Sequence, residues 1–266
     1  MTNKAGHECT RMHTNKAGVS HQLTLIRAGL RSHADEEFRR GVENFFREPV
    51  DAYGVRAPEV KSVAREAWLE VKSWPDTALE KLAAELWKSG KIEEAGIAIL
   101  IYRRRVKQCG AREFKLFERW IDRYVHNWAS CDGVASWLLA ASVGNEPALI
   151  GELDGWVRSR IRWKRRAAVV ALLQEAKQGR NTASVFRIAS ALIEDPDDMV
   201  QKGVGWVLKE TYPKKPAEVM KFLLPRAAHA PRLVLRLSAE KMTAADHARL
   251  LGRRISHTVG LKSRAG

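Results

Sequence analysis

The sequence predicts an all-α fold, an α-solenoid in which antiparallel helix pairs stack side by side. Between residues 20 and 254, apolar residues recur at i, i+3, i+4 and i+7 over stretches of helical length. Pro, Gly, Asp and Asn separate these stretches at short intervals, which is typical of helix ends joined by short loops. Strand-like alternation of apolar and polar residues is absent from the sequence. Two helices joined by a short loop must lie antiparallel to each other, so the sequence predicts a stack of antiparallel helix pairs.

The expected helices follow one another with few long connections. In chain order they span residues 20–31, 35–47, 58–73, 76–89, 92–108, 111–125, 130–142, 147–158, 161–177, 182–194, 197–211, 216–227, 231–241 and 244–254. No TPR-like or ankyrin-like motif recurs at a fixed period, so degenerate HEAT-like pairs are the repeat type that fits best. Such a stack forms a concave surface, and Lys and Arg along it would make a basic groove the size of a duplex.

The two ends of the chain differ from this pattern. Residues 1–19 carry TNKAG twice without apolar periodicity, and we expect a disordered basic leader there. Its two His and one Cys could bind a metal, but a segment without a fold does not hold ligands in place. Residues 20–254 are expected to form a single HEAT-like domain, and residues 255–266 a flexible basic tail.

The charge balance favours a polyanionic partner. The chain has 46 Lys and Arg against 31 Asp and Glu, a formal net charge of +15. Nucleic acid is the first candidate, and an anionic membrane surface is the second. No apolar run approaches the roughly 20 residues of a membrane span, and the start of the chain lacks the apolar segment of a secretory signal.

The three cysteines, Cys9, Cys109 and Cys131, lack metal-ligand spacing and do not suggest a disulfide framework. We therefore expect no metal, no cofactor and a reducing compartment. The expected protein is a cytoplasmic monomer, associated with the nucleoid in a prokaryote.

An acidic residue breaks the apolar pattern in the segment NWASCDGVASWLL. Asp132 shares a helical row with Trp128, Ala135 and Leu139, although the row otherwise reads as core-facing. The simple explanation is a first-turn acid near a helix N-terminus. That explanation accounts for the charge but not for the shared row, and no basic partner stands at i+4.

Two further positions break the pattern of their helices. Arg166 falls on an apolar row, where it either reaches water at the edge of the row or meets a carboxylate or phosphate. Gly203 and Gly205 lie inside the helix that carries Trp206. Each glycine destabilises the helix by roughly 0.5–1 kcal/mol relative to alanine. Close helix packing explains them best, and an opening for a ligand beside Trp206 is the alternative.

Aromatic and basic residues are both abundant. Most of the nine tryptophans are expected in the core or at helix junctions, among them Trp68, Trp87, Trp120, Trp137 and Trp156. A single basic cluster is usually a solvated helix face. The number of clusters, together with the net charge, raises the odds of phosphate contacts.

A resemblance to a known family rests on five segments. They are YGVRAPEVKSVA (53–64), NWASCD (127–132), WKRRAAVVALL (163–173), VQKGVGWVLKETYPKKP (200–216) and VLRLSAEKM (234–242). In this order and spacing they resemble the AlkD-like DNA alkylation-repair glycosylases, which are built from HEAT-like repeats. The resemblance covers roughly residues 35–242.

The resemblance implies cleavage of the N-glycosidic bond of N3- or N7-alkylated purines in duplex DNA, such as 3-methyladenine and 7-methylguanine. It implies catalytic roles for Trp128, Asp132 and Trp206 and a phosphate contact for Arg166. Neighbouring cations are expected to bind the DNA backbone: Lys164, Arg165, Lys202 and Lys214.

The chain departs from the family pattern at several positions. Asn127 replaces a second aromatic residue, and Ala129 stands where the family often has Asp. Tyr53 does not match the family's DNA-contacting Tyr, for which Phe45 or Phe46 is a loose candidate. The alternative function is a non-catalytic scaffold that binds damaged or branched DNA. A protein-interaction solenoid fits the composition but leaves Asp132 unexplained.

Overall fold

The computed structural model describes the backbone of residues 4–252 and the side chains from residue 17 onward. Within this range the chain forms only helices joined by short connections. The helices are α1 (Lys4–Ser32), α2 (Glu36–Phe45), α3 (Ala57–Val71), α4 (Asp76–Lys88), α5 (Ile92–Arg103), η1 (Val106–Gln108), α6 (Ala111–Arg123), α7 (Trp128–Gly133), η2 (Val134–Leu139), α8 (Ala140–Asn145), η3 (Pro147–Glu152), α9 (Leu153–Trp156), α10 (Arg162–Val170), α11 (Leu173–Gln178), α12 (Thr182–Leu192), α13 (Asp198–Thr211), α14 (Pro216–Leu223), η4 (Leu224–Arg226), α15 (Arg232–Ala239) and α16 (Ala244–Leu251). The predicted all-α class is confirmed.

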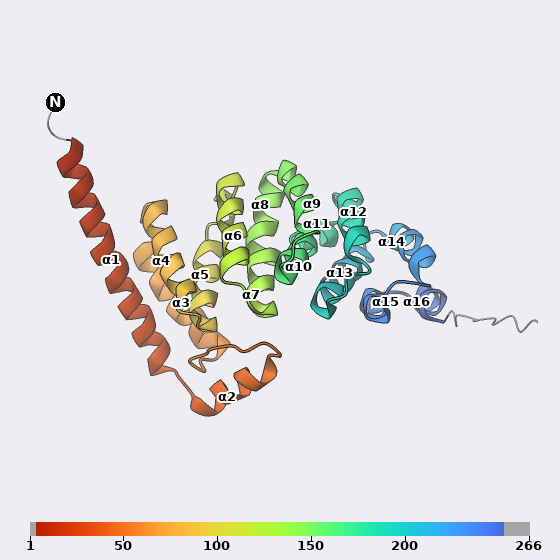
Figure 1. Cartoon of the computed structure of the whole chain (residues 1–266), viewed down its shortest axis with the longest axis horizontal. Coiled ribbons are helices and arrows are strands. Elements are labelled where there is room, and N and C mark those ends of the chain that lie inside the picture. The colour runs from red at the N-terminus through yellow and green to blue at the C-terminus, as the bar shows by residue number, and fades with distance from the viewer. Residues whose placement is uncertain (1–3, 253–266) are drawn as a thin grey trace, which may run out of the picture.

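The helices stand in one elongated row from α1 to α16, and α2 lies off this row (Figure 1). One layer runs through α3, α5, α7 with η2, α10, α13 and α15, each in contact with the next. The helices α4, α6, α9, α12, α14 and α16 alternate with these along the chain. One continuous apolar core fills the space between the helices, from Val19 in α1 to Leu250 in α16.

Capping residues set several helix starts, as the sequence punctuation predicted. The side chains of Asp35, Asn127, Asp197 and Thr243 accept backbone N–H bonds at the starts of α2, α7, α13 and α16. A glycine ends another helix: Gly179, directly after the C-terminal end of α11, adopts a left-handed conformation with φ of 67°. These local signals account for the short loops of the solenoid.

Several boundaries differ from the expectation. From Lys4 to Ser32 the backbone is one helix, whereas residues 1–19 were expected to be disordered. This stretch has no proline to interrupt a helix whose later turns pack Leu23, Ile26 and Leu30 into the core. The helix expected at 161–177 is divided into α10 and α11. The tail expected at 255–266 lies outside the described residues.

Two adjacent acids attach the N-terminal elements to the stack. Glu93 accepts bonds from the backbone N–H groups of Tyr53, Gly54 and Val55 at 2.9–3.0 Å. Glu94 is fully buried and accepts bonds from Arg27 and from the Tyr53 hydroxyl. These bonds fix the connector between α2 and α3 in place, so the YGVR segment has a structural role.

The glycines of α13 allow close packing on both sides. A Cβ on Gly203 would lie 3.3 Å from Arg166 Cγ, and a Cβ on Gly205 would lie 2.7 Å from Leu237 Cβ. Close helix packing therefore explains both positions, and it draws α13 against α10 and α15.

Replacing Gly205 by Ala should destabilise the protein by about 1–3 kcal/mol, because the added methyl group overpacks the contact with α15. Gly144→Ala is the matched control, since a Cβ there meets nothing within 4 Å. Thermal and denaturant unfolding measure both variants. Equal stability of the two variants would contradict the packing explanation.

Candidate functional site

The short helix α7 presents the acidic residue that stood out in the sequence. Asn127 caps the helix, its side-chain oxygen accepting a 2.9 Å bond from the Ser130 backbone N–H. Asn127 therefore has a structural function where the family pattern has an aromatic residue. Trp128 is the first residue of α7 and Asp132 the fifth. Asp132 thus lies beyond the first turn, and the explanation as a first-turn acid is wrong.

Asp132 is paired with a residue distant in the sequence. The Nε of Arg166 donates to one carboxylate oxygen and Nη2 to the other, both at 2.8 Å. This two-point geometry fixes the carboxylate plane as well as its position. The basic partner that the local sequence lacked comes from α10.

Arg166 is enclosed by protein. It is only 5% exposed, and its Nη1 donates to the backbone carbonyl of Met199 at the start of α13. Burial disfavours the charged guanidinium, but the bonds and charge of Asp132 outweigh this effect and raise the pKa of Arg166. Of the two alternatives for Arg166, contact with a carboxylate is confirmed and exposure to water at the edge of the row is wrong. Three of the five N–H donors of the guanidinium bind protein groups, and the phosphate contact of Arg166 stays a prediction.

A cavity of about 880 Å³ lies beside this ion pair, and we call it the central cavity. Its wall includes Trp128 and Asp132 from α7 and Trp206 from α13. The sequence therefore identified three residues that share one cavity. Arg166 lies behind Asp132 and is not part of the wall.

The wall of the central cavity is mostly apolar. Besides three tryptophans, Trp128, Trp137 and Trp206, it includes aliphatic and aromatic residues of α2, α3 and α5, among them Phe38, Val42, Val60, Ile99 and Leu100. The basic residues on the wall are Lys61 and Lys177, and both are exposed. Neither forms an ion pair with another residue of the described range. These two lysines were not singled out in the sequence.

Two aromatic residues at the end of α2 cover Trp128. The Phe46 ring stacks on the indole at a centroid distance of 5.4 Å and an interplanar angle of 22°. Phe45 meets the same indole edge-on at 6.0 Å and is 71% exposed. In the sequence, Phe45 or Phe46 was only a loose candidate for the family's DNA-contacting Tyr. Local periodicity does not show how the chain after α2 brings these residues to α7.

Ion pairs hold the residues after this doublet across the site. Glu48 accepts a 2.6 Å bond from Arg162 of α10, and Arg47 lies 3.4 Å from Asp198 of α13. In Figure 1 the connector after α2 extends toward the end of α7 and returns to α3. Since α2 has no buried residue of its own, these contacts and the stacking position it.

The other predicted backbone-binding residues have differing environments. Lys164 pairs with Glu118 at 3.0 Å and Asp122 at 2.9 Å, and Arg165 pairs with Asp195 at 2.6 Å. Lys202 pairs with Asp198 at 3.1 Å. Lys214 is exposed and has no ion pair within the described range. Pairing reduces the positive field that the first three cations offer to a phosphate.

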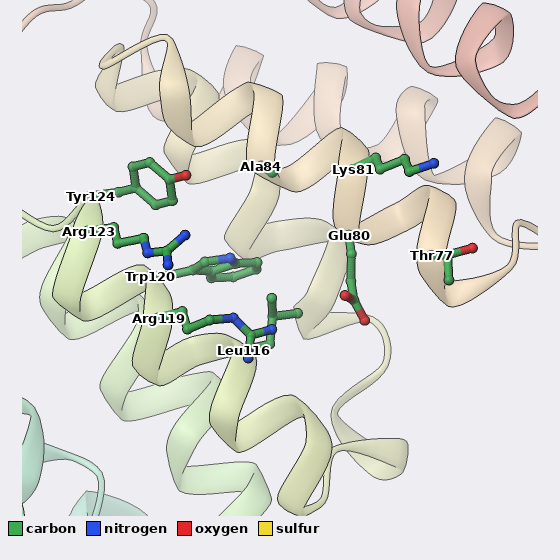
Figure 2. Close-up of a pocket in the computed structure, with 9 residues that line it drawn as sticks. All are labelled: Thr77, Glu80, Lys81, Ala84, Leu116, Arg119, Trp120, Arg123 and Tyr124. Carbon is green, nitrogen blue, oxygen red and sulfur yellow. The ribbon is translucent and has the colours of Figure 1, made fainter. Parts of the chain in front are cut away.

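A second hollow, of about 360 Å³, lies between α4 and α6. Figure 2 shows Arg119, Trp120 and Arg123 of α6 beside Glu80, Lys81 and Ala84 of α4. None of the residues in the walls of the central cavity takes part in it. This outer hollow provides exposed cations that can serve as controls for those at the site.

Neither a metal site nor a membrane span is found in the described part of the chain. No group of three or more His, Cys, Asp or Glu is placed to hold a metal ion there. No helix among the described residues has the length and apolar character to cross a membrane. The side chains of His7, Cys9 and His13 lie outside the described side chains.

Comparison with known proteins places the chain in a family. A family model described as DNA alkylation repair enzyme matches residues 26–242. No curated protein matches the chain. A structure described as a predicted DNA alkylation repair enzyme from Enterococcus faecalis has a TM-score of 0.72 at 16% identity, covering 80% of this chain and 98% of its own. AlkD2 from Streptococcus mutans gives a TM-score of 0.54 at 19% identity, covering 77% of this chain and 97% of its own. These structures share the fold, and the family match extends over most of the chain, so the chain belongs to the DNA alkylation repair enzyme family.

Proposed function

We propose that this protein is a DNA glycosylase that hydrolyses the N-glycosidic bond of N3- or N7-alkylated purines in duplex DNA. The observation that carries the proposal is a carboxylate, Asp132, fixed by Arg166 on the wall of a cavity that also contains Trp128 and Trp206. Family membership supports a role in alkylation repair.

The proposed reaction needs only modest assistance from the protein. An N3- or N7-alkylated purine is cationic, so it leaves as a neutral base when the C1′–N bond breaks. The sugar then resembles an oxocarbenium ion, and water adds to C1′ to give the abasic product. Stabilisation of the positive sugar is therefore the main task of the site.

Asp132 has the charge and position for this task. An ionised carboxylate opposes the developing positive charge, and it can accept the proton that the water loses. Its two bonds to Arg166 use one acceptor site on each oxygen and leave the other sites for a water molecule. We assign Arg166 the role of positioning this carboxylate, in place of the phosphate contact implied by resemblance.

The two tryptophans can add to the stabilisation. Aromatic faces attract a cation more strongly as its charge develops, so Trp128 and Trp206 favour the transition state over the ground state. One ring face of Trp128 is covered by Phe46, so the sugar meets the remaining surface or displaces Phe46.

Asp132→Asn should retain binding to methylated duplex DNA but release much less 7-methylguanine or 3-methyladenine, because the amide cannot oppose the sugar charge. Asp154→Asn is the matched control, an exposed aspartate of α9 paired with Arg187. Chromatography of the released bases measures activity. Wild-type protein that binds a panel of alkylated duplexes and releases no base would refute the proposal and favour the scaffold.

The pair of Asp132 and Arg166 should behave as one unit in unfolding. Arg166→Met leaves a carboxylate without its partner, and we expect a loss of about 3 kcal/mol, since breaking a buried pair is costly. The double variant with Asp132→Asn should lose less than the sum of the single losses. Additive losses in denaturant unfolding would show that the two side chains do not stabilise each other.

The exposed lysines of the central cavity should contact phosphates. Lys61→Ala and Lys177→Ala should each lower the slope of log affinity against log salt by about one unit, because each removes one phosphate contact. Lys81→Ala, in the outer hollow, is the control and should leave the slope unchanged. Equal slopes for all three variants would show that Lys61 and Lys177 do not contact DNA phosphates.

A further inference from the structure

Three cations line the outer hollow between α4 and α6 without an acidic partner. Arg119 and Arg123 stand about one helical turn apart on α6, and Lys81 lies on α4. All three are exposed, and their side chains form no ion pair and no hydrogen bond within residues 17–252. Like charges one turn apart repel each other, so this arrangement favours an anion that comes from another molecule.

Cations in the first half of α6 are paired, in contrast to those in its second half. Arg112 binds Asp76 and Glu80 of α4. Lys115 pairs with Glu152 of η3 at 2.8 Å. The fold therefore neutralises the cations near the start of α6 and leaves the two arginines of its last turns without an acid.

The outer hollow also has an apolar floor. Leu116 and Trp120 of α6 line it, and in Figure 2 the Trp120 indole lies between the two arginine side chains. Tyr124 lines the hollow as well, and its ring stacks on the buried Trp87 at a centroid distance of 6.1 Å and an interplanar angle of 16°. Tryptophan, tyrosine and arginine are the residues that most often carry the affinity of protein–protein interfaces. The hollow therefore has the composition of a protein-binding site.

The outer hollow is separate from the proposed site for DNA. Its residues belong to α4, to α6 and to the position directly after α6. The residues of the central cavity belong to α2, α3, α5, α7, η2, α11 and α13 and to the connector between α2 and α3. The proposed reaction at Asp132 therefore gives no role to Arg119 or Arg123.

The chemistry of the hollow favours an acidic peptide over other anions. A guanidinium binds a carboxylate through two parallel bonds, and an apolar side chain of the same peptide covers the floor. A sugar–phosphate backbone has no apolar group for the floor, and the carboxylate of Glu80 stands on the same wall. A second copy of a chain with a net charge of +15 is disfavoured by repulsion. Residues 253–266 contain no Asp or Glu, so they bring no carboxylate to the hollow.

We propose that the outer hollow is a docking site for an acidic segment of another protein. Carboxylates of the segment bind Arg119 and Arg123, and one apolar side chain lies over Trp120. Lys81 adds positive charge that speeds the encounter with an acidic partner. The inference goes beyond the proposed function, because the two sites share no residue and the protein can hold DNA and this partner at the same time.

The test uses fluorescein-labelled short peptides in which glutamate and serine alternate around a single leucine, whose position is moved along the series. Fluorescence anisotropy at physiological ionic strength measures their binding to the full chain. At least one peptide should bind the wild-type protein. Replacing its leucine by serine should lower the affinity by about 10-fold, because the buried side chain is lost while the charge of the peptide is kept.

Variants of the protein locate the bound peptide. Arg119→Ala and Arg123→Ala should each lower affinity for the best peptide by about 10-fold, because each loses a two-point bond to a carboxylate. Arg232→Ala is the matched control, an exposed arginine of α15 with no ion pair within the described range, and it should bind the peptide as wild type does. All three variants should release alkylated bases from DNA as wild type does. Circular dichroism and thermal unfolding establish that each variant is folded.

The outcomes separate a docking site from general attraction between charges. Binding that is unchanged by the loss of leucine, or that falls equally in Arg119→Ala and Arg232→Ala, would overturn the proposal, as would the absence of binding to every peptide in the series. Weaker binding of labelled duplex DNA by Arg119→Ala, with peptide binding unchanged, would assign the hollow to nucleic acid instead. Peptide binding that depends on both arginines and on leucine would support the docking site even if wild-type protein releases no base.

Discussion

The buried ion pair between Asp132 and Arg166 determines the form of the candidate site. Desolvating two charges is costly, and only excellent geometry with further bonds compensates for it. Both 2.8 Å bonds and the Met199 carbonyl satisfy that condition. Gly203 contributes as well, because the absence of a Cβ allows α13 to approach the stem of Arg166. Three helices, α7, α10 and α13, thus converge on one carboxylate, and the solenoid packing and the proposed chemistry depend on the same contacts.

The aromatic contacts on Trp128 add a second constraint. Phe46 stacks on the indole, while Arg47 and Glu48 reach α13 and α10. The position of this segment depends in turn on Glu93 and Glu94, whose bonds hold the connector at Tyr53. A substrate that uses the covered face of Trp128 must displace Phe46 and the partly exposed pairs that follow it. The pair of Arg47 and Asp198 is exposed and contributes little stability. Glu48 is largely buried beside Arg162, so separating that pair accounts for more of the cost of displacement.

Local patterns in the sequence predicted the helices, their caps and the residue types of the site. Asp132 stood out because it breaks an apolar row, and Trp206 because it follows two unexpected glycines. The family resemblance then assigned Trp128, Asp132 and Trp206 to the site. Their partners were not predictable, since Arg166 lies 34 residues from Asp132 and Phe46 reaches Trp128 through an irregular loop. Trp137 was expected in the core or at a helix junction but is 38% exposed, for a different reason. The π-helical turn changes the periodicity on which the assignment of Trp137 to the core relied.

The fate of the basic residues shows why net charge alone does not locate a nucleic-acid interface. Lys164 and Arg165 belong to the densest basic cluster, yet Lys164 is bound to Glu118 and Asp122 of α6 and Arg165 to Asp195 in the connector before α13, and both are largely buried. Their charges are used to join helices. Lys61 and Lys177 are isolated in the sequence, yet they are exposed on the wall of the central cavity. A cation is free for a phosphate or a base only where the fold supplies no acid, and this condition is set by the packing of the helices.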